Sequence, residues 1–148
     1  MTIFEALRIS HDRQRELAEK MVATSGDSPE RQALFSQLKE ELAAHSVAEE
    51  RHFYVPLLQD DLGVDLSRHA IAEHHEMDEM IEGLEETDLS SPSWLAQAKA
   101  LSEKVHHHLH EEEQKFFQMA GKLLSETQKS KLSSAYLSTY DEQKAAVS

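Results

Sequence analysis

The sequence predicts an all-α protein: an up-down-up-down four-helix bundle with a short additional C-terminal helix. Only 4 glycines and 3 prolines interrupt the 148 residues, and residues of high helix propensity fill the long stretches between them. Apolar residues recur at helical spacing in five segments. The second half of the chain also repeats the pattern of the first, which predicts two helical hairpins that dock antiparallel through their apolar faces.

The first two helices have sharp start signals. Thr2 and Glu5 form a capping box at the beginning of a helix expected over residues 3–24, which ends where a Thr-Ser-Gly segment breaks the apolar pattern. A Ser-Pro pair at 28–29 combines an N-cap with a first-turn proline. The second helix is therefore expected to begin there and to run to the neighbourhood of Pro56.

The remaining helices follow the same logic. The third has no comparable start signal, and its apolar stripe predicts a beginning near Asp65 or Ser67. The Ser-Pro pair at 91–92 repeats the earlier start signal and predicts the fourth helix. A capping box then precedes a fifth helix over about residues 126–141, which is expected to lie across the bundle.

Composition excludes several classes of protein. The absence of cysteine rules out disulfides, thiolate zinc sites, iron–sulfur clusters and a cysteine nucleophile. With 15 basic and 28 acidic residues, the formal net charge of -13 would repel nucleic acid. No segment approaches the ~20 apolar residues needed to cross a membrane. We therefore expect one cytoplasmic domain over residues 1–148, with its bundle at about 3–120 and with neither a nucleic-acid nor a membrane partner.

A shift of 63 positions superimposes the two halves of the sequence. It aligns both Ser-Pro start signals and takes His11 onto His74. It also aligns two copies of the motif His-x-x-x-Glu-Glu-x-x-aromatic-aromatic, at residues 45–54 and 108–117. One offset that matches start signals, an apolar stripe and the polar residues within that stripe indicates an internal duplication.

Polar residues lie on the apolar faces of these helices. His45 and Glu49 are one turn apart on the face defined by Leu38, Leu42 and Phe53, so both point into the core. The same spacing recurs in the second motif, and the lone histidines lie at a matching depth in the first and third helices. Buried carboxylates need a compensating cation. The sequence therefore predicts a metal site with six ligands: His11, His45, Glu49, His74, His108 and Glu112.

The donor set indicates which metal binds and how many ions there are. Imidazole and carboxylate ligands without sulfur suit iron, manganese or zinc rather than magnesium, calcium or copper(I). Two facing carboxylates can each bridge a pair of ions, while a pair of histidines terminates each ion. The ligand count therefore fits two metal ions better than one.

At these residues the chain resembles the hemerythrin-like, or HHE cation-binding, family over about residues 3–120. The resemblance rests on the two motif copies, each with a lone helical histidine upstream. It implies a four-helix bundle around a non-haem di-iron centre, with an oxo or hydroxo bridge and with reactivity toward O2 and related small molecules. It also implies a ligand assignment: His11 and His45 on one iron, His74 and His108 on the other, and Glu49 and Glu112 as bridges.

One position departs from the family pattern. Oxygen-carrying hemerythrins place a second histidine one turn after the third-helix ligand, where this chain has Asp78. Either Asp78 ligates or a water fills that position, and both outcomes argue against reversible oxygen carriage. They favour iron handling, peroxide or nitric oxide chemistry, sensing or detoxification. The alternative function is a helical binding module in which zinc or manganese only stabilises the bundle and a protein partner binds the acidic surface.

Other histidines and acids near the motifs have plainer interpretations. His75 adjoins His74, but its own face carries acidic residues, so we favour His74 as the ligand. Glu50 and Glu113 either support the ligands or face water. The remaining histidines are expected on the surface: His52, His69, His106, His107 and His110.

Overall fold

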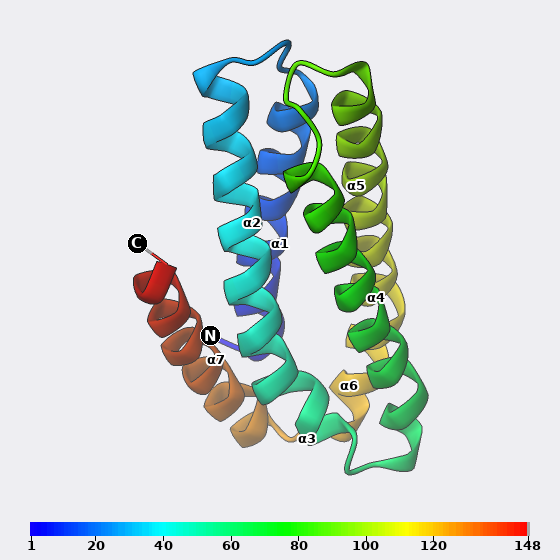
Figure 1. The fold of residues 1–148 in the computed structure, drawn as a ribbon. Coiled ribbons are helices and arrows are strands. Elements are labelled where there is room, and N and C mark those ends of the chain that lie inside the picture. The colour runs from blue at the N-terminus through cyan, green and yellow to red at the C-terminus, as the bar shows by residue number, and fades with distance from the viewer. Residues whose placement is uncertain (148) are drawn as a thin grey trace.

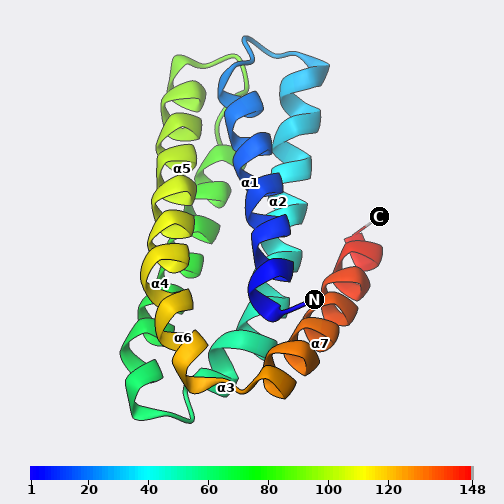
Figure 2. The same ribbon diagram turned by 180° about the vertical axis from the view of Figure 1, so that it is seen from behind.

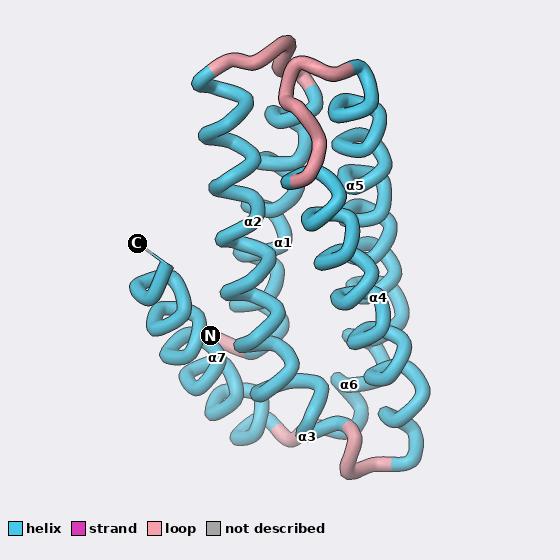
Figure 3. Tube along the Cα trace, viewed as in Figure 1, coloured by secondary structure: helices cyan, strands magenta, loops and turns pink. Residues whose placement is uncertain are grey.

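Four long helices run alternately up and down around one elongated core, as predicted (Figure 1). The structure, a computed structural model, describes residues 1–147, and no strand occurs among them. The connecting loops lie at the ends of the bundle (Figure 3). None of the described helices has both the length and the apolar character needed to span a bilayer. The bundle consists of α1 (Ile3–Val22), α2 (Pro29–Glu49), α4 (Asp61–Glu85) and α5 (Pro92–Glu111).

α2 and α5 each continue through a short π-helical segment into a further stretch of α-helix. In each segment a backbone N–H donates to the carbonyl five residues earlier rather than four. The wider turn brings Tyr54 to the side of the helix on which Glu49 lies, and the sequence pattern did not predict it. The added segments are η1 (Glu50–Tyr54) and α3 (Val55–Leu57) after α2, and η2 (Glu112–Phe116) and α6 (Phe117–Leu123) after α5.

The predicted helix starts hold except at the third helix of the bundle. The capping box of α1 forms, with Glu5 N donating to Thr2 Oγ1 over 3.2 Å and Thr2 N donating to Glu5 Oε1 over 3.0 Å. α4 begins at Asp61, earlier than the expected start near residues 65–67. The reason is Asp60, whose side chain accepts a hydrogen bond from Leu62 N and caps the helix.

α7 (Glu126–Val147) packs obliquely against α1 and α2 on the outside of the bundle (Figure 2). It begins at the expected residue and runs beyond the expected end near residue 141, so it is longer than predicted. Its later turns are held by a buried carboxylate on α2: Tyr140 donates to Glu41 Oε1 over 2.6 Å, and Lys144 Nζ lies 3.6 Å from the same oxygen. These polar contacts extend the helix beyond the end of its apolar stripe.

The core consists of two apolar clusters with a polar layer between them. One cluster surrounds Trp94, near the loops that join α1 to α2 and α4 to α5. The other surrounds Phe53 and Phe116 toward the opposite end of the bundle. Between the two clusters, all four bundle helices contribute polar side chains that are buried. Burying such groups costs free energy unless they form hydrogen bonds with one another or bind an ion, so this layer is the candidate functional site.

Candidate metal centre

The polar layer contains all six residues that the sequence predicted as ligands. α1 contributes His11, α4 contributes His74, and the other four come as pairs one turn apart from the continuous helices α2–η1 and α5–η2. Each of the six side chains belongs to a residue that is at most 4% exposed. The duplication visible in the sequence therefore corresponds to two similar halves that meet at a common depth.

Each of the four imidazoles directs its Nε2 toward a carboxylate oxygen of the layer. Ligand atoms bound to one first-row metal ion at about 2.0–2.2 Å are roughly 3–3.6 Å apart, and the observed separations lie in that range. The distances are His45 Nε2 to Glu49 Oε1 3.1 Å, His74 Nε2 to Glu49 Oε1 3.2 Å, His11 Nε2 to Glu112 Oε1 3.3 Å and His108 Nε2 to Glu112 Oε2 3.6 Å.

Two groups of three ligand atoms can each hold a metal ion. One group is His11, His45 and Glu49, the other is Glu49, His74 and His108, and within each group the atoms lie within 4.8 Å of one another. Glu49 belongs to both groups. A carboxylate shared by two groups of ligands fits the arrangement in which it bridges two ions.

Several inward-facing atoms of the layer have no hydrogen-bond partner. They are His11 Nε2, His108 Nε2, Glu49 Oε2 and Glu112 Oε1, all fully buried. A buried polar atom without a partner costs about 1–3 kcal/mol, so such atoms are rare unless an ion or water satisfies them. The four atoms belong to residues of metal-ligating type and face one another. The residues present therefore fit a metal centre.

The electrostatics of the two lone histidines point the same way. Burial lowers the pKa of His11, but the nearby carboxylates of Glu112 and Glu113 outweigh it and raise that pKa to about 9. Burial likewise opposes the raised pKa of His74, which the carboxylates of Glu49 and Glu50 bring to about 10. In the metal-free protein both imidazoles are therefore cationic at neutral pH. Their protons supply positive charge that the acidic layer requires.

The two carboxylates of the layer titrate in opposite directions. Burial and the neighbouring charge of Glu49 raise the pKa of Glu112 above its usual range. Burial also acts to raise the pKa of Glu49, but His45, Glu112 and His74 outweigh it and hold that pKa well below its usual range. Glu49 is therefore ionised, whereas the ionised form of Glu112 is costly without a nearby cation.

The outer ring nitrogens bond to groups that orient the imidazoles. When Nδ1 of a histidine donates to an oxygen, Nε2 is left free and aimed at the centre. Three histidines have such a partner: His11 Nδ1 lies 2.6 Å from Glu113 Oε2, His45 Nδ1 2.8 Å from Tyr136 Oη, and His108 Nδ1 3.0 Å from Glu73 Oε1. Glu113 thus supports a predicted ligand. Glu50 lies 3.8 Å from His74 Nδ1, too far for a hydrogen bond.

Sequence reasoning missed Glu73, Tyr136 and Tyr54 as members of the site. Tyr136 lies on the apolar stripe of the C-terminal helix, and Glu73 has a serine in its place in the first half of the chain. Tyr54 carried a visible signal, because the same position of the second motif is Phe117. A hydroxyl present in only one of two matching motifs indicates a role specific to that half.

Tyr54 Oη lies between the two carboxylates, which share its single O–H as a hydrogen-bond donor. It lies 2.7 Å from Glu49 Oε1 and also bonds to Glu112 Oε2. Burial and the adjacent carboxylates raise the pKa of Tyr54 well above its usual range, so the hydroxyl keeps its proton. Tyr54 therefore fixes the relative position of Glu49 and Glu112.

Other candidates lie outside the layer. His75 is 75% exposed and pairs with Glu79, four residues on, over 3.1 Å. Asp78 is exposed and belongs to neither group of inward-facing ligand atoms; with Glu50 and His74 it lines a depression on the surface. The structure thus brings His74, and not His75 or Asp78, into the layer.

We expect Tyr54→Phe to lower the stability of the metal-free protein by about 1–3 kcal/mol, because two buried carboxylates lose a hydrogen-bond donor while the ring is kept. Tyr140→Phe is the matched control. Its carboxylate partner Glu41 retains Ser10 at 2.8 Å and Arg13 at 3.0 Å. Chemical denaturation of both variants after metal removal measures the difference, and equal losses would contradict the role of Tyr54.

Comparisons with known proteins agree with this geometry. A search of curated proteins found no match. Among solved structures, the chain is similar to the crystal structure of a hemerythrin HHE cation binding domain-containing protein from Mycobacterium kansasii, with a TM-score of 0.89 and 22% identity, covering 99% of this chain and 89% of that one. The family model of the hemerythrin HHE cation binding domain matches residues 2–120. The chain therefore belongs to the hemerythrin HHE cation-binding family.

Proposed function

We propose that the buried layer holds a non-haem di-iron centre and that the protein binds O2 or a related small molecule, peroxide or nitric oxide, in oxygen or iron handling, sensing or detoxification. Zinc or manganese can substitute in the same donor set. The proposed ligands are His11, His45, Glu49, His74, His108 and Glu112.

One observation carries the proposal: four imidazoles and two carboxylates share one buried layer, and four of their inward-facing atoms have no hydrogen-bond partner. A hydrogen-bonded network without metal would have used these atoms. The donors are nitrogen and oxygen only, which suits iron, manganese and zinc. Since two groups of three donors share Glu49, the layer suits two ions rather than one.

The protein itself positions the donors and keeps water away from them. Iron bound there would supply one-electron redox chemistry and an open coordination position for a small molecule. The rings of Phe53 and Phe116 lie 5.1 Å apart and cover one side of the layer, and Tyr54 lies 5.3 Å from Phe116. Tyr54 also holds its proton at Oη, between the carboxylates. These aromatic side chains exclude water from one side of the layer, which suits a site that handles reactive oxygen species.

Metal analysis after expression in iron-supplied medium tests the proposal. We expect two iron ions per chain and absorption bands that change when the protein is reduced with dithionite and reoxidised in air. Absence of iron and of redox-dependent bands would reject it. A redox-silent zinc or manganese ion whose removal unfolds the chain would instead favour a structural metal in a module that binds a protein partner.

A pair of neighbouring histidines tests the ligand assignment. We expect His74→Ala to lose bound metal and His75→Ala to retain it, because His74 is buried beside Glu49 while His75 points to solvent. The two residues share one helix, so a general loss of helix stability affects both variants alike. Metal content by mass spectrometry and helicity by circular dichroism separate ligand loss from unfolding. Equal metal content in both variants would contradict the assignment.

A further inference from the structure

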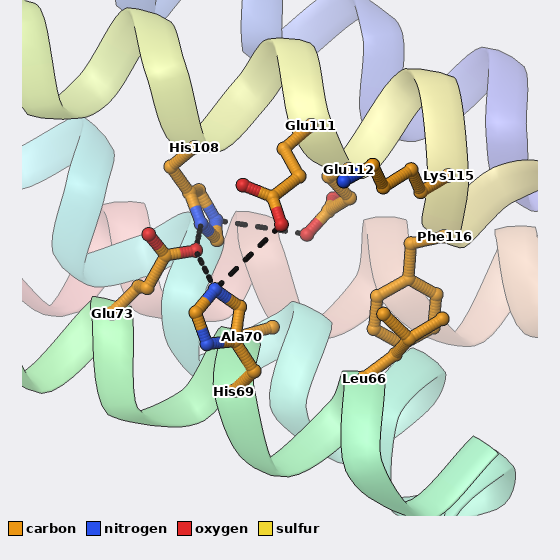
Figure 4. Close-up of a pocket in the computed structure, with 9 residues that line it drawn as sticks. All are labelled: Leu66, His69, Ala70, Glu73, His108, Glu111, Glu112, Lys115 and Phe116. Atoms are coloured by element: carbon orange, nitrogen blue, oxygen red, sulfur yellow. Dashed lines mark hydrogen bonds and ion pairs between the residues drawn. The ribbon is translucent and has the colours of Figure 1, made fainter.

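A second group of metal-ligating side chains lies outside the centre, between α4 and α5 (Figure 4). His69 and Glu73 are one turn apart on α4, and Glu111 is the last residue of α5. Each of the three offers one ligand atom, and these atoms lie within 4.8 Å of one another. The sequence had suggested only an ordinary surface position for His69.

The geometry of this outer group resembles that of a single metal ion's ligands. His69 Nε2 lies 3.3 Å from Glu73 Oε1 and 3.8 Å from Glu111 Oε1. Donors bound tetrahedrally at about 2.0–2.2 Å would be roughly 3.4 Å apart, between these two values. Lys104 Nζ bonds to the other oxygen of Glu73 over 3.0 Å, and Oε1, which also contacts His108 Nδ1, keeps a second lone pair for the group. Three protein donors would leave a further position for water.

A small cavity joins the outer group to the buried centre. Its volume is about 20 Å³, enough for about one water molecule, and its lining includes the three outer residues together with His108 and Glu112 (Figure 4). Both His108 and Glu112 are at least nine-tenths buried, and each has an atom without a hydrogen-bond partner, His108 Nε2 and Glu112 Oε1. The cavity therefore borders the exposed His69 as well as two buried residues that carry unpartnered atoms.

Glu73 connects the two sets of donors directly. Its Oε1 lies 3.3 Å from His69 Nε2 on the outer side and 3.0 Å from His108 Nδ1 on the inner side. The side chain exposure falls along the same path, from 56% at His69 to 6% at Glu73 and 3% at His108. A cation that reaches the outer group is thus one residue away from a proposed ligand of the centre.

We propose that His69, Glu73 and Glu111 bind a third divalent transition-metal cation, and that metal ions are captured there on their way to the inner centre. The donor set of one imidazole and two carboxylates suits ferrous iron or zinc. The capture role rests on the proposed function of the centre, whereas the outer site itself does not. Without a cation, the same distances fit direct contacts between His69 and the two carboxylates, and the experiment must separate the two.

The test uses crystals of the full chain soaked with zinc and an anomalous difference map at the zinc edge. We expect peaks in the inner layer and one further peak between His69, Glu73 and Glu111. His69→Ala should remove that outer peak and weaken the corresponding zinc affinity at least roughly tenfold, leaving the inner peaks in place. His75→Ala is the matched control, since it is also an exposed α4 histidine paired with a glutamate four residues on. It should keep the outer peak.

A kinetic measurement tests the capture role. We expect the inner centre of the metal-free protein to take up ferrous ion several-fold more slowly in His69→Ala than in His75→Ala, with the same final iron content at the inner centre. Unchanged uptake would overturn the capture role. No outer peak in the wild type, or an outer peak that persists in His69→Ala, would overturn the outer site. An outer peak with an empty inner layer would refute the proposed centre and leave the outer cation site standing.

Discussion

Glu112→Gln should abolish metal binding at the inner centre and at the same time stabilise the metal-free protein. The amide keeps the shape of the side chain but removes a charge that two metal ions require, so we expect metal affinity to fall by more than about 100-fold. Without metal, burial beside Glu49 raises the pKa of Glu112, so its ionised form is costly. At pH 8 the neutral amide should add on the order of 2 kcal/mol of stability.

The expected changes are opposite in direction: metal affinity falls, whereas the stability of the metal-free protein rises. A variant that merely damaged the fold would lose both metal and stability. Glu103→Gln is the control, because Glu103 is exposed on α5 and its replacement should change neither quantity. Metal content and chemical denaturation with and without metal give the two readouts. Metal binding retained by Glu112→Gln, or a less stable metal-free variant, would contradict the assignment of Glu112 as a metal-bound carboxylate.

The sequence was sufficient to predict the four bundle helices and the residues that meet in their core. Both follow from local rules, because capping signals mark the helix starts and the helical repeat decides which side chains share a face. The internal duplication added the depth at which the two halves meet. His74 was preferred to His75 on this ground, and the structure buries His74 and exposes His75.

The missed features depend on contacts that no local rule contains. The π-helical turn after α2 contains one more residue than an α-helical turn, and this extra residue brings Tyr54 to the carboxylates. Tyr136 reaches His45 because α7 packs against the bundle, and Glu73 reaches His108 across the interface of α4 and α5. No local sequence pattern marks these residues as members of the site, since their partners are distant in the chain.

The metal-free protein should lose stability as the pH rises from about 7 to 10, whereas the metal-loaded protein should not. The pKa values of His11 and His74 are raised to about 9 and about 10 from an ordinary value of 6.5. A group whose pKa is raised by folding contributes stability that is complete below its unfolded pKa and is lost as the pH passes through its folded pKa. For His11 the contribution is on the order of 3 kcal/mol.

At acidic pH the metal-free protein should lose stability for a different reason, and this loss grows as the pH falls. Hydrogen bonding to His108 lowers the pKa of Glu73 to about 2, and the pKa of Glu113 is also about 2, because His11 and Arg15 outweigh the effect of burial. Their contributions are present above the ordinary carboxyl pKa of 4.5 and are lost as the pH falls toward 2. The metal-free protein should therefore be most stable at mildly acidic to neutral pH.

Metal binding should consequently release protons and strengthen with pH. Nε2 cannot hold both a proton and a metal ion, so each ion must displace the proton of His11 or His74 at neutral pH. Each proton released makes the apparent affinity rise about tenfold per pH unit below the pKa of that histidine. Titration with zinc in weakly buffered solution measures the release directly, and His106→Ala should release as many protons as the wild type.

Binding that released no protons at pH 7, together with flat stability up to pH 10, would mean that the buried imidazoles are neutral in the metal-free state. In that case the acidic layer would have to be balanced by something other than protons or metal, and no other buried cation adjoins Glu49 and Glu112 among residues 1–147.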